Sequence, residues 1–151
     1  MHPLAIGFVS GAVSGVVMGL FSHFLFLLKI FKSNLIIVDG SFFFRTTKLK
    51  SSGQSIFVAG LLIHLVTSGV FGAIYILATS FLGLNAKTVG SFLLISLYIA
   101  LLYLSMLFIA LPVVGEGFLG RKSGPYAWFE QLILHVVFAL LYYGCLRIFL
   151  L

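Results

Sequence analysis

Residues 54–77 read QSIFVAGLLIHLVTSGVFGAIYIL, an apolar run without a single lysine, arginine, aspartate or glutamate. A helix needs ~20 predominantly apolar residues to cross the hydrocarbon core of a bilayer. Three further runs meet this requirement, at residues 4–28, 89–113 and 125–149. The sequence therefore predicts an all-α, polytopic membrane protein in which residues 1–151 form a single domain, a bundle of four transmembrane helices.

The composition points to the same class of protein. Hydrophobic residues make up 62% of the chain and charged residues only 8%, whereas a soluble domain carries about 25% charged residues. The single cysteine, Cys145, excludes an internal disulfide. The net charge is +6, and the basic residues flank the apolar runs, which predicts contact with the lipid bilayer and no nucleic-acid partner.

The basic residues also predict an orientation. The first and third connections lie on one side of the predicted bundle, and the other side has only Lys87 and Arg147. Because cytoplasmic loops of membrane proteins are enriched in lysine and arginine, we expect these two connections in the cytoplasm and both termini outside. The residues that we expect to contact lipid headgroups there are Lys29, Lys32, Arg45, Lys48, Lys50, Arg121 and Lys122.

The first of these connections, residues 29–53, contains two apolar patches that are too short to cross a bilayer. Asp39 and Gly40 stand between the patches, and this dipeptide is typical of a turn. We expect the segment to lie along the membrane interface, with its phenylalanines among the headgroups.

Small residues recur at four-residue spacing in the first two predicted helices. In the first helix they are Gly7, Gly11, Gly15 and Gly19, and in the second they are Gly60, Ser68 and Gly72, with His64 in the same series. Small residues at this spacing allow two helices to approach closely inside a bilayer. The pattern predicts tight helix packing along both stripes.

Two histidines occupy nearly identical contexts, LLIHLV around His64 and LILHVV around His135. Each lies ten residues into its predicted helix, about 15 Å from the cytoplasmic end at the usual helical rise. His23 lies nearer that end, about 9 Å deep. The matching contexts predict that the bundle consists of two similar helical hairpins, with His64 and His135 at the same level.

Three roles for these histidines are open. They could be the axial ligands of a b-type haem or another tetrapyrrole, with Gly60 and Ser68 leaving room for the flat ring. They could form hydrogen bonds between helices, or they could handle protons or a metal ion, with His23 as a further ligand. Spacing alone does not fix helix rotation, so the sequence does not say whether His64 and His135 face each other.

No arrangement of residues typical of hydrolases is recognisable, and GEGFLG at residues 115–120 lacks the strand that precedes a dinucleotide-binding loop. We therefore expect a non-catalytic integral membrane subunit that anchors or bridges other membrane subunits in a larger complex, of the electron-transfer type. The alternative is a small oligomeric carrier or channel for protons, ions or a metal.

The chain resembles a loose group of small bacterial four-helix inner-membrane proteins. The resemblance rests on the glycine stripe of the first helix, on HLVTSGVFGAIY in the second, on ALPVVGEGFLG after the third and on LHVVFALLYYG in the fourth. The group shares a pattern of histidine followed by glycine or tyrosine in helices two and four. The resemblance implies a four-helix architecture and a location in the bacterial inner membrane, without implying an activity.

Overall fold

The structure, a computed structural model, describes residues 2–150, and for residues 86, 87 and 150 it describes only the backbone. The described residues form helices and no strand. Four helices are long and apolar enough to cross a membrane, namely Pro3–Leu27, Gly53–Phe81, Phe92–Val113 and Ala127–Phe149. The prediction of an all-helical chain with four long apolar helices is therefore confirmed.

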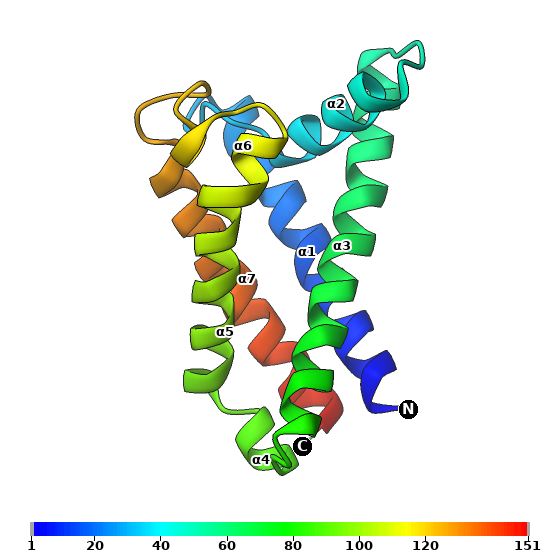
Figure 1. The fold of residues 1–151 in the computed structure, drawn as a ribbon, viewed down its shortest axis with the longest axis vertical. Helices are drawn as coiled ribbons and strands as arrows, with labels where there is room; N and C mark the ends of the chain where they lie inside the picture. Colours follow the sequence, from blue (N-terminus) through cyan, green and yellow to red (C-terminus); the bar gives the residue numbers. More distant parts are fainter. Residues whose placement is uncertain (1, 151) are drawn as a thin grey trace.

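The elements follow one another as α1 (Pro3–Leu27), α2 (Leu35–Thr47), α3 (Gly53–Phe81), α4 (Ala86–Val89), α5 (Phe92–Ser105), a π-helical turn η1 (Met106–Ala110), α6 (Leu111–Val113), a 3₁₀ turn η2 (Phe118–Gly120) and α7 (Ala127–Leu150). Figure 1 shows α2 lying across one end of the long helices, next to the connection between α6 and α7. The short helix α4 and both chain ends lie at the opposite end.

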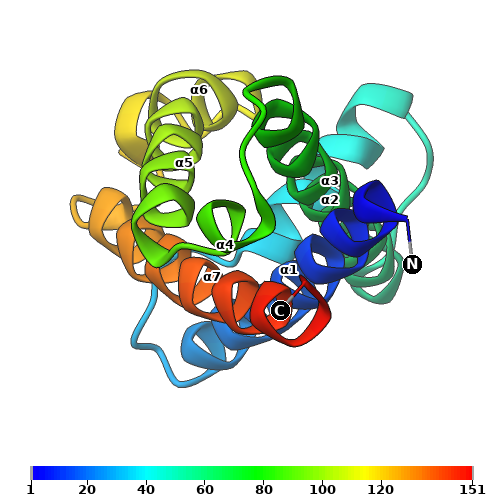
Figure 2. The same ribbon diagram turned by 90° about the horizontal axis from the view of Figure 1, so that it is seen from below.

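The long helices pack in pairs, α1 against α3 and α5 against α7, and α1 also packs against α7. Figure 2 shows this arrangement along the helix axes. Helix α5 has few partners, and its leucines Leu93, Leu97 and Leu101 are exposed. The outward faces of the bundle are thus apolar, as the composition requires.

Polar caps set the boundaries of the inner helices. Ser52 and Ser55 form a reciprocal capping box at the start of α3, and the Ser91 side chain accepts a hydrogen bond from the Leu94 amide at the start of α5. At the start of α2, the Asn34 side chain accepts from the Ile37 amide at 3.4 Å. Such caps satisfy amide groups that have no partner within the helix.

The prediction of a turn at Asp39–Gly40 is wrong, because both residues lie within the continuous helix α2. Gly40 packs against α3, where a Cβ atom added to it would lie 1.9 Å from the Ile56 carbonyl oxygen. A Cβ atom on Gly60 of α3 would in turn lie 1.9 Å from the Ile36 oxygen of α2. Glycine is therefore needed here for close helix crossing and not for a turn.

Helices α1 and α3 approach equally closely. A Cβ atom on Gly11 would lie 2.3 Å from the Ser68 carbonyl oxygen, and one on Gly72 would lie 2.2 Å from the Gly7 oxygen. The glycine stripe of α1 thus faces α3 throughout, with Gly15 next to the Ser68 side chain. Helix α2 packs across one end of the resulting α1–α3 pair.

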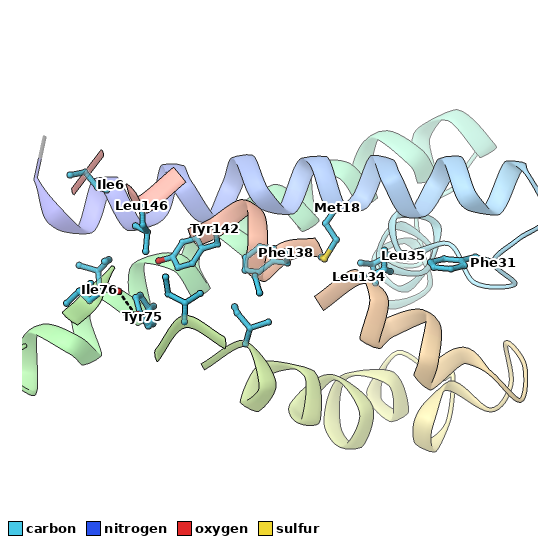
Figure 3. Packing of buried hydrophobic residues seen from close by; sticks show 14 residues of the cluster. Ile6, Met18, Phe31, Leu35, Tyr75, Ile76, Leu134, Phe138, Tyr142 and Leu146 are labelled. Carbon is cyan, nitrogen blue, oxygen red and sulfur yellow. Dashed lines mark hydrogen bonds between the residues drawn. The ribbon is translucent and has the colours of Figure 1, made fainter. Parts of the chain in front are cut away.

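The buried hydrophobic cluster extends along α1 from Ile6 and reaches Phe31 in the connection after the helix, as Figure 3 shows. Tyr75 and Tyr142 are the largest fully buried side chains in it, and they contact each other edge to face with ring centroids 5.7 Å apart. The cluster joins the α1–α3 pair to α7 and leaves a cavity between α3 and α5.

Candidate functional site

A cavity of about 310 Å³ lies between the two helix pairs. Helix α2 covers one end of it with Leu35 and Asp39, and α1 and α7 form its back with Met18 and Phe138. Its volume falls at the lower end of the range for small-molecule sites, about 300–1,000 Å³. The lining is mostly apolar and includes both histidines that the sequence singles out, His64 and His135.

Three tyrosines lie beyond the lining residues, on the side of the cavity that faces α4. Each lies one helical turn beyond a lining residue, and each donates a hydrogen bond to a backbone carbonyl. The Tyr75 hydroxyl donates to the Val89 oxygen at 2.6 Å. The other two hydroxyls donate to α3, Tyr98 to Phe71 at 2.8 Å and Tyr142 to Gly72 at 2.9 Å.

The cavity opens sideways, between α3 and α5. Thr67 and Phe71 of α3 and Ser105 of α5 line it and are at the same time exposed. The other lining residues for which burial is described are buried or half-buried. We call these three residues the mouth of the cavity.

His64 is buried, with 7% of its surface exposed, and it pairs with an acidic residue from α2. Its Nδ1 lies 3.1 Å from Asp39 Oδ2, the one contact between a histidine and a carboxylate in the described part of the chain. A carboxylate only accepts hydrogen bonds, so Nδ1 carries the proton. The other ring nitrogen, Nε2, is buried and has no hydrogen-bond partner among the described residues.

His135 is held in the same tautomer by a different acceptor. Its Nδ1 donates to the Gln131 carbonyl oxygen one turn earlier in α7, at 2.8 Å, and the Tyr103 ring contacts its edge with centroids 5.4 Å apart. Because Nδ1 is used by this bond, Nε2 of the neutral ring is an acceptor. Both imidazoles therefore have a fixed Nδ1 and an Nε2 lone pair without an intramolecular donor among residues 2–150.

His23 is not part of this cavity. Its Nδ1 lies 2.7 Å from the Asn34 side-chain nitrogen at the start of α2, and its ring packs against Phe57. The described residues hold no cluster of three or more His, Cys, Asp or Glu side chains that could bind a metal ion.

Of the two small residues expected beside a ring, Ser68 lines the cavity and Gly60 lies against α2. Phe71 and Phe138 also line the cavity, whereas Trp128 is 42% exposed outside it.

The wall opposite α3 contains the π-helical turn η1, where Met106 and Ala110 face the cavity. Pro112 follows two residues after the end of this turn, where proline supplies no amide donor and its ring crowds the carbonyl of residue 108. The Leu111 amide bonds to the Met106 oxygen instead. The change of hydrogen-bond register widens the helix where it borders the cavity.

Glu130 anchors the connection between α1 and α2. Its carboxylate accepts from the Lys32 amide at 2.8 Å, and from the Ser33 amide at 3.1 Å and the Ser33 hydroxyl at 2.7 Å. The partners of this carboxylate are thus two backbone amides and a hydroxyl. This connection holds α2 in place over the cavity.

The basic residues expected at lipid headgroups belong to the end of the bundle that carries α2 and the connection between α6 and α7 (Figure 1). Arg45 has a specific contact there, since its guanidinium donates to the Val114 carbonyl oxygen at the end of α6. This bond ties α2 to the second helix pair.

No family of known proteins, no curated protein and no solved structure matches the chain.

Proposed function

We propose that this chain is an integral membrane protein of the bacterial inner membrane, crossed by its four long helices. Their length and apolar composition support this. The end with α2 faces the cytoplasm and both termini face outward, because seven of the nine lysines and arginines belong to elements at the α2 end. The pairs α1–α3 and α5–α7 would descend from one repeated hairpin.

Within the membrane the protein holds a redox ligand as a non-catalytic subunit of a larger electron-transfer complex. One observation carries this proposal. Two histidines from different helix pairs line a single cavity, and each has its Nδ1 occupied while its Nε2 has no intramolecular donor. A carboxylate or carbonyl behind an imidazole is the usual way to orient it toward a ligand.

A tetrapyrrole is the ligand class that the sequence suggests, and the donor set suits it. His64 and His135 would hold it through Nε2, and Asp39 would keep the His64 ring in its orientation through Nδ1. Such a group would supply one-electron transfer when bound. Phe71 and Phe138 would flank the ring.

The first experiment is to purify the protein in mild detergent, record its visible spectrum, and extract and identify bound small molecules. The proposal predicts a ligand in stoichiometric amount that is lost in His64→Ala and in His135→Ala, together with larger membrane partners in the same preparation. A haem band that disappears in both variants would identify a tetrapyrrole. A folded protein that carries no small molecule, from cells with full cofactor supply, would contradict the ligand-holding role.

The second candidate function is a small oligomeric carrier of protons, ions or a metal. It is favoured by the Asp39–His64 pair, which places two titratable groups in the cavity wall, with His135 as a third. Purified protein in liposomes would then show proton or cation flux without partners. Asp39→Asn would abolish that flux.

A further inference from the structure

The side opening of the cavity determines where a ligand can come from. The mouth lies between two long apolar helices, whereas α2 covers one end of the cavity and the three hydrogen-bonded tyrosines lie beyond the other end. In a protein that spans the bilayer, such a mouth faces the acyl chains. A ligand that enters there must be soluble in lipid.

The charges of the cavity restrict the ligand further. The residues that line it include the acidic Asp39 and neither lysine nor arginine. A carboxylate held inside the cavity would meet no cation and would be repelled by Asp39. The part of the ligand inside the cavity is therefore uncharged, and an apolar part extends through the mouth.

The two Nε2 atoms specify the polar part of the ligand. His64 Nε2 is buried without a partner, and the residue itself is more than nine-tenths buried. With Nδ1 as the donor, Nε2 of each neutral imidazole is an acceptor, and both rings line the cavity. Two acceptors on different helices require a head group with two hydroxyl donors on a flat ring, which the aromatic lining would contact.

We propose that this cavity binds the head group of a lipid-soluble para-benzoquinol, whose hydroxyls donate to Nε2 of His64 and of His135 while its isoprenoid tail leaves between α3 and α5. The inference rests on the proposed ligand-holding function and names the class of ligand. It concerns binding alone. The oxidised quinone has two carbonyl acceptors and no donor, so it pairs poorly with two lone pairs.

The test uses the full-length protein in nanodiscs of quinone-free phosphatidylcholine, titrated calorimetrically with a decyl-substituted benzoquinol and with its oxidised form. Empty nanodiscs correct for partition into lipid. We expect saturable binding of the quinol at least tenfold tighter than that of the quinone. Equal affinity, or tighter binding of the quinone, would overturn the proposal, and this comparison requires no variant.

Variants then locate the site. Ser105→Phe places a ring in the mouth and should weaken quinol binding at least tenfold, whereas Leu101→Phe, on the exposed face one turn away, should bind like the wild type. His64→Phe and His135→Phe should each lose the preference for the reduced form. Wild-type binding by a folded Ser105→Phe variant would contradict entry between α3 and α5.

The outcomes separate this inference from the proposed function. A tetrapyrrole in the purified protein, with no saturable quinol binding, would overturn the proposal that the cavity binds a quinol. The proposed function as a ligand-holding subunit would still stand. Failure of both ligand classes, together with flux in liposomes, would overturn both proposals in favour of the carrier.

Discussion

Glu130 is a single carboxylate that satisfies two backbone amides and one hydroxyl in the connection before α2. Replacing it with alanine leaves the part-buried Lys32 amide and the buried Ser33 amide without this acceptor, and a buried polar group without a partner costs about 1–3 kcal/mol. We therefore expect Glu130→Ala to lower the free energy of unfolding by about 2–4 kcal/mol. Unfolding of the detergent-solubilised protein with increasing SDS measures this loss.

Glu116 provides the matched control. It accepts one side-chain bond, from the Ser123 hydroxyl at 2.5 Å, in a half-buried position. Glu116→Ala should cost less than about 1 kcal/mol. In Glu130→Ala, trypsin should also cleave after Lys32 faster than in the control. Equal losses in the two variants would show that Glu130 does not hold this connection.

The tautomer of His64 is a second prediction at the scale of single residues. With Asp39 as acceptor, ¹⁵N NMR of histidine-labelled protein should show the proton on Nδ1, and Asp39→Ala should allow it to exchange between the two nitrogens. His135 is the internal control, since its acceptor is a backbone carbonyl that the variant keeps. A proton found on Nε2 of His64 in the wild type would contradict the orientation of the site.

At the scale of elements, the close crossing of α1 and α3 is possible because glycine has no Cβ atom. Gly72→Ala would place its Cβ 2.2 Å from the Gly7 carbonyl oxygen, so the helices must separate, at a typical overpacking cost of about 1–3 kcal/mol. Gly144→Ala in α7 is the control, because no heavy atom lies within 4 Å of its added Cβ. The control should leave the SDS midpoint unchanged or raise it, and a similar loss in both variants would refute close packing as the cause.

The long helices could be predicted because their signal is local. An apolar run of sufficient length forms a helix whatever its neighbours are, and the boundaries at Ser52 and Ser91 follow from side-chain caps. Helix α2 was missed because the turn signal of Asp39–Gly40 outweighed the helical spacing of its apolar residues. Asp39–Gly40 usually marks a turn, but here Gly40 fits against Ile56 of α3 and Asp39 pairs with His64.

The same reasoning applies to the site. The equal depth of His64 and His135 follows from sequence positions, and both do line one cavity. Their rotation, and the presence of Asp39 beside His64, depend on how α2 crosses α3. A signal was available, since Leu35, Ile36, Asp39 and Gly40 share one helical face at spacings of three and four residues. Reading that face as a helix would have placed Asp39 toward the bundle.

At the scale of the whole molecule, the two ends of the bundle differ in charge, and this difference predicts an orientation in the membrane. The α2 end has seven lysines and arginines, and the end with α4 has only Lys87 and Arg147. Since Cys145 is the single cysteine, Cys145→Ser gives a background in which one exposed site at a time can be labelled. Ser51→Cys tests the α2 end and Asn85→Cys the α4 end, and neither substitution changes a charge.

In intact bacterial cells, a membrane-impermeant maleimide that reaches the periplasm should label Asn85→Cys and leave Ser51→Cys unlabelled, because basic residues are retained on the cytoplasmic side. Permeabilised cells should label both, which controls for the exposure of each site. Labelling of Ser51→Cys alone would reverse the orientation and place the Asp39–His64 pair toward the periplasmic side. Labelling of both sites in intact cells would mean that the bundle does not separate its two ends across a membrane, and the argument for a ligand entering from the lipid would fail with it.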